Sequence, residues 1–129
     1  MPLDTAVVGA GVVSDSHLYA LQRSPLTNAV AICDLDEERA REKATEYGIR
    51  SYTDLEAMIE AESLDWLHVC TPPRTHLDVS RTAIEAGIPI LIEKPVAETV
   101  AEVEDIGAAA ADHDVTVAVV HNHNFDRAM

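Results

Sequence analysis

The stretch Gly9-Ala10-Gly11-Val12-Val13-Ser14 follows the apolar run Thr5-Ala6-Val7-Val8 and precedes a helical pattern. In a turn of this spacing, the first glycine permits a tight bend and the second lets the backbone approach a pyrophosphate. The third position, here Ser14, must be small for helix and strand to pack closely. A phosphate would lie against Gly9, Gly11 and the amides of Val12 and Val13, where the helix dipole favours negative charge. The stretch therefore predicts a dinucleotide-binding turn, and a tight turn without a ligand is the alternative.

Apolar runs and amphipathic helical patterns alternate along the whole chain. The runs predict strands at 4–8, 29–33, 66–70, 89–93 and 115–120, with a weaker strand near 51–52. The helical patterns lie at about 16–23, 36–47, 54–62, 75–86 and 98–112. Near-continuous apolar strands indicate a sheet covered by helices on both faces, and strict alternation is typical of parallel sheets. We expect an α/β fold in three layers, a doubly wound parallel (Rossmann) sheet of six strands in the order 3-2-1-4-5-6.

Asp34 closes the second predicted strand, 23 residues after Gly11. An acid at about this spacing accepts hydrogen bonds from the adenosine ribose in dinucleotide-binding folds. Leu35 follows, and no Arg or Lys stands next to it, so a 2′-phosphate would meet a carboxylate without an obvious cation. The sequence therefore favours NAD over NADP. The alternative is that Asp34 only caps the next helix, for which Asp36 is the better candidate.

The charge balance excludes several kinds of partner. In 129 residues, a length that suits one domain, 23 carboxylates face nine Lys and Arg, for a formal net charge of −14. Such an acidic chain repels nucleic acid and anionic membranes. No apolar run is long enough for a membrane helix, and no leader pattern precedes the first strand, so we expect a cytoplasmic protein. Only two lysines are present, which suggests a halophilic, high-salt cytoplasm; an ordinary acidic protein is the alternative.

The second half of the chain carries the more specific motifs. The fourth predicted strand leads into Thr71-Pro72-Pro73-Arg74-Thr75-His76, and the fifth leads into Glu93-Lys94-Pro95. Together with the glycine turn and Asp34, this set resembles the Gfo/Idh/MocA family of sugar and polyol oxidoreductases over nearly the whole chain. Thr71, Pro72 and His76 are candidate cofactor-binding residues. The resemblance implies that Glu93 and Lys94 lie beside the nicotinamide ribose and the substrate.

Lys94 is the candidate catalytic residue. It follows the fifth strand, and ligands of open α/β sheets bind at the carboxyl ends of the strands. An ammonium at that place can polarise a carbonyl or stabilise an alkoxide as hydride moves to a nicotinamide. A surface lysine paired with Glu93 is the alternative. We further expect the Lys94–Pro95 peptide bond to be cis, since only an X-Pro bond makes that isomer cheap.

The histidines and cysteines have less specific interpretations. His76 either flanks the nicotinamide or its phosphates, or makes a hydrogen bond at a helix start, and both remain open. For His17 a structural role is favoured, and His68 is expected to be a packed, hydrogen-bonded strand residue. His121 and His123 lack a third ligand at a suitable spacing, so we expect no metal. Cys33 and Cys70 are expected to be small buried side chains on strands too far apart for a disulfide.

The domain division follows from the resemblance. Residues 1–120 are expected to form the dinucleotide-binding domain, and 121–129 to begin the crossover into a substrate domain that these residues do not include. The function expected is the cofactor-binding part of an NAD-dependent dehydrogenase of a longer protein, with this part alone inactive. Its substrate would be a small sugar or polyol, and an uncovered apolar patch near Lys94 and after Val120 could lead to homo-oligomers. The alternatives are an NAD-binding or redox-sensing regulatory module without catalysis and, less favoured, a methyltransferase.

Overall fold

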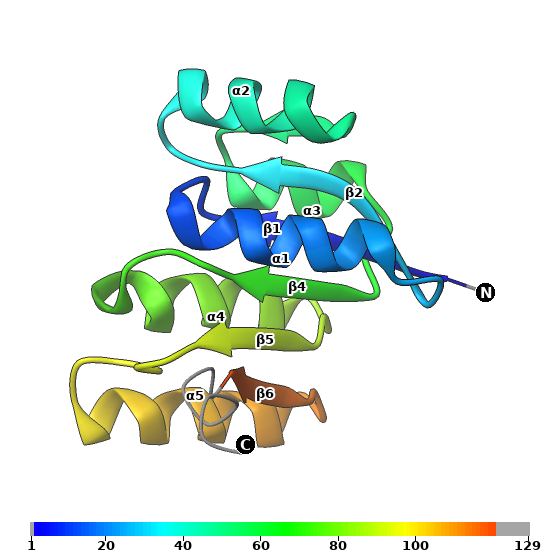
Figure 1. Ribbon diagram of the computed structural model, residues 1–129. Helices are drawn as coiled ribbons and strands as arrows, with labels where there is room; N and C mark the ends of the chain where they lie inside the picture. The colour runs from blue at the N-terminus through cyan, green and yellow to red at the C-terminus, as the bar shows by residue number, and fades with distance from the viewer. Residues whose placement is uncertain (1, 121–129) are drawn as a thin grey trace, which may run out of the picture.

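A computed structural model describes residues 2–120 as six parallel strands in the order β3-β2-β1-β4-β5-β6, flanked by helices (Figure 1). The predicted strand number, direction and order are confirmed. The strands are β1 (Leu3–Val8), β2 (Thr27–Cys33), β3 (Arg50–Tyr52), β4 (Trp66–Val69), β5 (Ile90–Glu93) and β6 (Val117–Val120). The helices are α1 (Val12–Arg23), α2 (Glu37–Tyr47), α3 (Leu55–Ala61), α4 (His76–Glu85) and α5 (Val100–Asp112), and a 3-10 turn, η1 (Pro73–Thr75), precedes α4.

The helices cover the two faces of the sheet unequally. In Figure 1, α1 and α2 lie on the near face, and α3, α4 and α5 lie behind the sheet. Ala6 and Val8 of β1 pack into the core cluster that includes residues of α3, α4 and α5, whereas Val7 packs into the cluster with α1 and α2. Because successive strand residues point to opposite faces, both sides of β1 must be apolar. This explains why its sequence shows a continuous apolar run rather than alternation.

The helix ends agree with the sequence except at the start of α1. Asp36 caps α2, with its carboxylate accepting hydrogen bonds from the backbone N–H groups of Glu38 and Arg39, and Gly48 ends the helix in the left-handed conformation at φ 68°. Helix α1, however, begins at Val12 and not near residue 16. The β-branched pair after Gly11 has low helix propensity, which hid the first turn from the helical pattern.

The open edge of the sheet is formed by β6, whose four residues are all half-buried. The most exposed large apolar side chains among the described residues, Leu35, Val12, Val100 and Leu26, lie elsewhere, at 72–93% exposure. The predicted apolar patch after Val120 and the predicted crossover at 121–129 fall outside the described residues. Within residues 2–120, no helix is long and apolar enough to cross a membrane.

Strand order also separates the two cysteines. β1 lies between the strand that ends at Cys33 and the strand that precedes Cys70, and both are free thiols. Burial, with Asp34 and Asp54 nearby, raises the pKa of Cys33 to about 11. Burial and the neighbouring Glu93 raise the pKa of Cys70 to about 12. Both thiols are therefore neutral near pH 7, which fits the structural role expected for them.

Candidate cofactor-binding site

The carboxyl ends of four adjacent strands, β2, β1, β4 and β5, open onto one cleft of about 380 Å³. Every residue singled out from the sequence as a cofactor or catalytic residue lines it: Gly9, Gly11, Val12, Val13, Asp34, Thr71, Pro72, His76, Glu93 and Lys94. Four further residues complete the lining, namely Arg39, Cys70, Pro73 and Pro95. Residues from opposite ends of the chain therefore meet at the edge where parallel sheets bind ligands.

The two glycines of the turn have different structural tasks. Gly9 has φ +104°, and a Cβ there would lie 2.7 Å from the carbonyl carbon and oxygen of Cys70. Only glycine lets β1 and the end of β4 approach this closely. At Gly11 an added Cβ would meet no atom within 4 Å, so the space beside it is open. Gly9 thus closes the turn, whereas Gly11 leaves room in the cleft.

The start of α1 fits an anionic group. Gly11 is the N-cap residue and has no side chain to cap the helix. In the part of the chain that the structure describes, the N–H groups of Val12 and Val13 have no hydrogen-bond acceptor. Ser14 is fully buried and its hydroxyl donates to the Gly11 carbonyl at 2.6 Å, as the packing of helix on strand requires. Uncapped N–H groups beside open space form the kind of cradle that holds a pyrophosphate.

Asp34 is held at the β2 end of the cleft by two backbone hydrogen bonds. Its Oδ2 accepts from the N–H of Ala10 at 2.7 Å, and its Oδ1 accepts from the N–H of Asp36 at 2.8 Å. Asp36 performs the capping of α2, so the two acids have separate tasks. The bond to Ala10 links the acid to the glycine turn. The carboxylate is therefore fixed where a ribose next to the pyrophosphate would lie.

Arg39 is the cleft residue that the sequence argument missed. Its exposed side chain lines the same cleft as Asp34, and its Nε lies 3.9 Å from a carboxylate oxygen of Asp36. The cleft therefore holds a cation, although no Arg or Lys stands next to Asp34 in the sequence. Arg39 stands five positions after Asp34 in the sequence, and the first turn of α2 carries its side chain back to the cleft. The sequence shows a cation in that turn, but not that its side chain reaches the cleft.

The loops after β4 and β5 are joined by His76. Its ring is 1% exposed, with Nδ1 2.8 Å from the carbonyl oxygen of Val96 and Nε2 2.6 Å from that of Thr71. Both nitrogens are thus engaged with backbone carbonyls while the residue lines the cleft. Of the two roles left open for His76, these contacts fit the structural one. It holds the Thr71 loop and the loop after Lys94 together.

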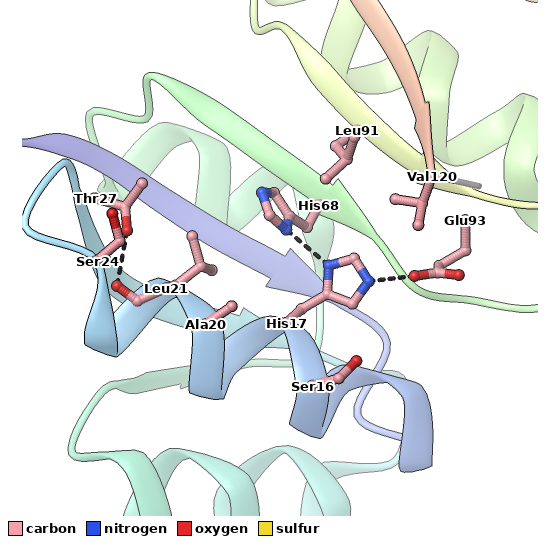
Figure 2. A pocket seen from close by; sticks show the side chains of 10 residues that line it. All are labelled: Ser16, His17, Ala20, Leu21, Ser24, Thr27, His68, Leu91, Glu93 and Val120. Carbon is pink, nitrogen blue, oxygen red and sulfur yellow. Dashed lines mark hydrogen bonds and ion pairs between the residues drawn. The ribbon is translucent and has the colours of Figure 1, made fainter. Parts of the chain in front are cut away.

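Lys94 and Glu93 form the other end of the cleft. Lys94 is exposed in the cleft, and the Lys94–Pro95 peptide bond is cis, which confirms the expectation. The Glu93 carboxylate contacts Nε2 of His17 on α1. Nδ1 of His17 lies 2.8 Å from Nδ1 of His68 on β4, as Figure 2 shows. The predicted structural roles of both histidines fit these contacts, but the contact of His17 with Glu93 was not predicted.

No group of three or more His, Cys, Asp or Glu side chains within residues 2–120 could hold a metal ion. The histidine pair does not form such a group, because His17 uses one nitrogen toward His68 and the other toward Glu93. The cleft instead offers backbone N–H groups, a carboxylate at one end and an ammonium at the other. Chemically, this arrangement suits an extended ligand with a central anionic part and a ribose.

Comparison with known proteins agrees with this geometry. A family model described as an oxidoreductase family with an NAD-binding Rossmann fold matches residues 3–121. The chain is 34% identical over 125 residues to a D-apiose dehydrogenase of Paraburkholderia graminis and 35% identical over 127 residues to a D-glucoside 3-dehydrogenase of Escherichia coli. Each match covers 96% of this chain but only 33% and 36% of the relative, so the chain spans about a third of their length.

Solved structures show the same fold. A probable dehydrogenase from Thermotoga maritima superimposes with a TM-score of 0.91 at 28% identity, over 97% of this chain and 38% of that one. GenD2 of gentamicin A biosynthesis, solved in complex with NAD, superimposes with a TM-score of 0.87 at 30% identity, over 92% of this chain and 34% of that one. Both similarities cover the described sheet and helices nearly completely.

Proposed function

Because the chain belongs to the Gfo/Idh/MocA oxidoreductase family through its NAD-binding Rossmann domain, we propose that it is the cofactor-binding part of a dehydrogenase. The reaction would move hydride between a hydroxyl carbon of a sugar, polyol or related compound and the nicotinamide. The observation that carries this proposal is the meeting of the glycine turn, Asp34 and Lys94 in one cleft. The names of the relatives, which act on apiose and on glucosides, support the substrate class.

Each residue of the cleft has a task in this proposal. The uncapped N–H groups of Val12 and Val13 bind the pyrophosphate, and Asp34 accepts hydrogen bonds from the adenosine ribose. When bound, NAD supplies the hydride acceptor. Lys94 donates a hydrogen bond to the substrate oxygen, which stabilises the negative charge that oxygen carries during hydride transfer. His76 holds in place the two loops on which the position of Lys94 depends.

The remaining parts of the substrate site are proposed to lie in a second domain of a longer protein. The share of the relatives that this chain spans supports this division, with residues 1–120 as the cofactor domain. On this proposal the 129 residues bind cofactor without turning over a sugar. We also propose that the protein works in a cytoplasm rich in salt, because its net charge of −14 would be screened there.

Calorimetric titration of the 129-residue chain with NAD and with NADP, in low and in high salt, tests the proposal. We expect NAD to bind more tightly than NADP. The variant Asp34→Ala should weaken NAD binding by about 1–3 kcal/mol, since hydrogen bonds to the ribose are lost. The same variant should narrow the preference for NAD over NADP. The double variant Asp34→Ala/Arg39→Ala is the matched control, because it also removes the cation available to a 2′-phosphate. Failure of the wild type to bind either cofactor would contradict the proposal, and a preference for NADP would contradict the role of Asp34.

A further inference from the structure

Glu93 borders two cavities. It lines the cofactor cleft together with Lys94, and it also lines a second cavity of about 430 Å³, to which α1, β2, β4, β5 and β6 contribute residues. His17 and His68 line that second cavity. Figure 2 shows a chain of contacts from the His68 ring to the His17 ring and on to the Glu93 carboxylate. Glu93 is therefore the point where a histidine pair on one side of the sheet meets the cleft.

The three side chains come from three different elements. His17 of α1 is 8% exposed, and its ring stands at 84° to the ring of His68 on β4, with the ring centres 5.0 Å apart. The nitrogen–nitrogen distance of 2.8 Å requires that one hydrogen lie between the two rings. On its other side, His17 contacts the carboxylate at the end of β5. The contact ties the helix that begins at the phosphate turn to the loop that carries Lys94.

The positions of the hydrogens on the two imidazole rings determine whether His17 donates a hydrogen bond to the Glu93 carboxylate. Burial and the nearby His17 lower the pKa of His68 to about 4, so His68 is neutral near pH 7. If His68 donates its Nδ1 hydrogen, a neutral His17 must carry its own hydrogen on Nε2. If a neutral His17 instead donates at Nδ1, its Nε2 carries no hydrogen and two acceptors would face each other at the Glu93 carboxylate, so this arrangement is disfavoured. The favoured arrangement is the one in which the Nε2–H of His17 donates to Glu93.

Strand order indicates which end of a dinucleotide Glu93 would meet. Asp34 marks the adenosine end at β2, and the glycine turn marks the pyrophosphate at β1. Glu93 is the last residue of β5, two strands beyond β1 and hence roughly 10 Å farther along the cleft. The nicotinamide is the part of the cofactor that remains for this end. Its ring is a cation in the oxidised form and neutral in the reduced form, so a nearby carboxylate favours the oxidised form.

We propose that His17, by donating to Glu93, sets how much negative charge this carboxylate presents to the nicotinamide, and thereby sets the preference of the protein for oxidised over reduced cofactor. This inference rests on the proposed function, because it requires NAD to bind in the cleft. His17 is a positioning residue here, since it acts through Glu93 and lies in the wall of the second cavity. His68 supports it by fixing the orientation of the His17 ring.

The test is the ratio of two dissociation constants, that of NADH divided by that of NAD⁺, measured by calorimetry on the full 129-residue chain. Glu93→Gln removes the charge and should lower the ratio about tenfold, whereas His17→Met removes the His17 donor from the carboxylate and should raise the ratio about threefold. The double variant should match Glu93→Gln alone, because His17 acts through that charge. His113→Met, at the exposed end of α5, is the matched control and should leave the ratio unchanged.

A merely structural role for His17 would weaken both cofactors by one factor and leave the ratio as in the wild type, which would overturn the proposal. Should His17→Met fail to fold, Glu93→Gln still decides, since an unchanged ratio in that variant overturns the proposal by itself. A wild type that binds neither cofactor would overturn the proposed function and this inference with it. Binding with an unaltered ratio would overturn this inference alone.

Discussion

At the scale of single residues, the role of each cleft residue depends on the atoms that lie opposite it. Gly9 and Gly11 stand two positions apart, yet an added Cβ would press on the Cys70 backbone at the first and meet open space at the second. Asp34 and Asp36 likewise stand two positions apart, and one faces the cleft while the other caps a helix. Residue type alone does not separate the two members of each pair, but their place relative to a strand end or a helix start predicts the separate roles that the structure shows.

The glycine pair yields a prediction with its own control. Gly9→Ala should lower the free energy of unfolding by on the order of 3 kcal/mol, since a Cβ at φ +104° both strains the backbone and clashes with Cys70. Gly11→Ala should leave the unfolding free energy nearly unchanged and weaken NAD binding, because the methyl group enters the space for the pyrophosphate. Urea unfolding and calorimetry of both variants check this. Equal stability of the two variants would contradict the proposed division of tasks.

His68 predicts a pH dependence of stability. Its pKa is lowered from 6.5 to about 4 by burial and by His17, so between these values the unfolded chain binds a proton that the native chain does not. Stability should therefore fall as the pH falls from 6.5 toward 4, by up to about 3 kcal/mol from this residue. Urea unfolding at a series of pH values should show a shallower fall in His68→Gln. If the stability of the wild type and of His68→Gln changed identically with pH, His68 would not be the cause of the fall in stability.

At the scale of elements, helix ends bring side chains to the cleft. α1 begins immediately after the glycine turn, so its first residues line the cleft. α2 begins after its Asp36 cap, and its first turn carries Arg39 to the same cleft. The η1 turn and α4 begin after β4 and bury His76 between two loops. Each of these helices thus starts at the carboxyl edge of the sheet, where its dipole adds to the site.

The cap of α2 can be tested by a single substitution. Asp36→Ala removes the acceptor for the N–H groups of Glu38 and Arg39, and it should lower the free energy of unfolding by about 1 kcal/mol. Glu42→Ala, in the exposed middle of the same helix, removes one carboxylate as well and serves as the control for charge. Its unfolding free energy should change by less than half as much. Equal effects in chemical denaturation would mean that lost charge, and not lost capping, explains both.

At the scale of the whole molecule, the excess carboxylates that give the net charge of −14 repel one another across a small domain. Raising the salt from about 0.1 M to about 1 M shortens the screening length from about 10 Å to about 3 Å, so that repulsion should weaken. The free energy of unfolding should therefore rise with KCl, by about 1–3 kcal/mol over this range. Thermal unfolding in KCl and in sucrose at matched osmolarity separates screening from a general solvent effect. An equal rise in both media would contradict the electrostatic explanation.

The sequence by itself determined the fold and much of the cleft. Strand order followed from the alternation of apolar runs with helices, and the glycine turn, Asp34 and Glu93-Lys94-Pro95 were each recognisable within a few residues. These features were predictable because they depend on local sterics, on burial of both faces of a strand, and on the rule that parallel strands end at one edge. Their meeting in one cleft then followed from topology.

Only the tertiary structure decided which further side chains join them. His17 meets His68 and Glu93 across 51 and 76 residues of sequence, and Arg39 reaches the cleft from a helix whose pattern reads as an ordinary polar surface. Such contacts depend on the rotation of α1 and α2 against the sheet, which is set by how the buried side chains on both sides fill their common space. No local pattern encodes that rotation, because it results from the packing of all the elements at once.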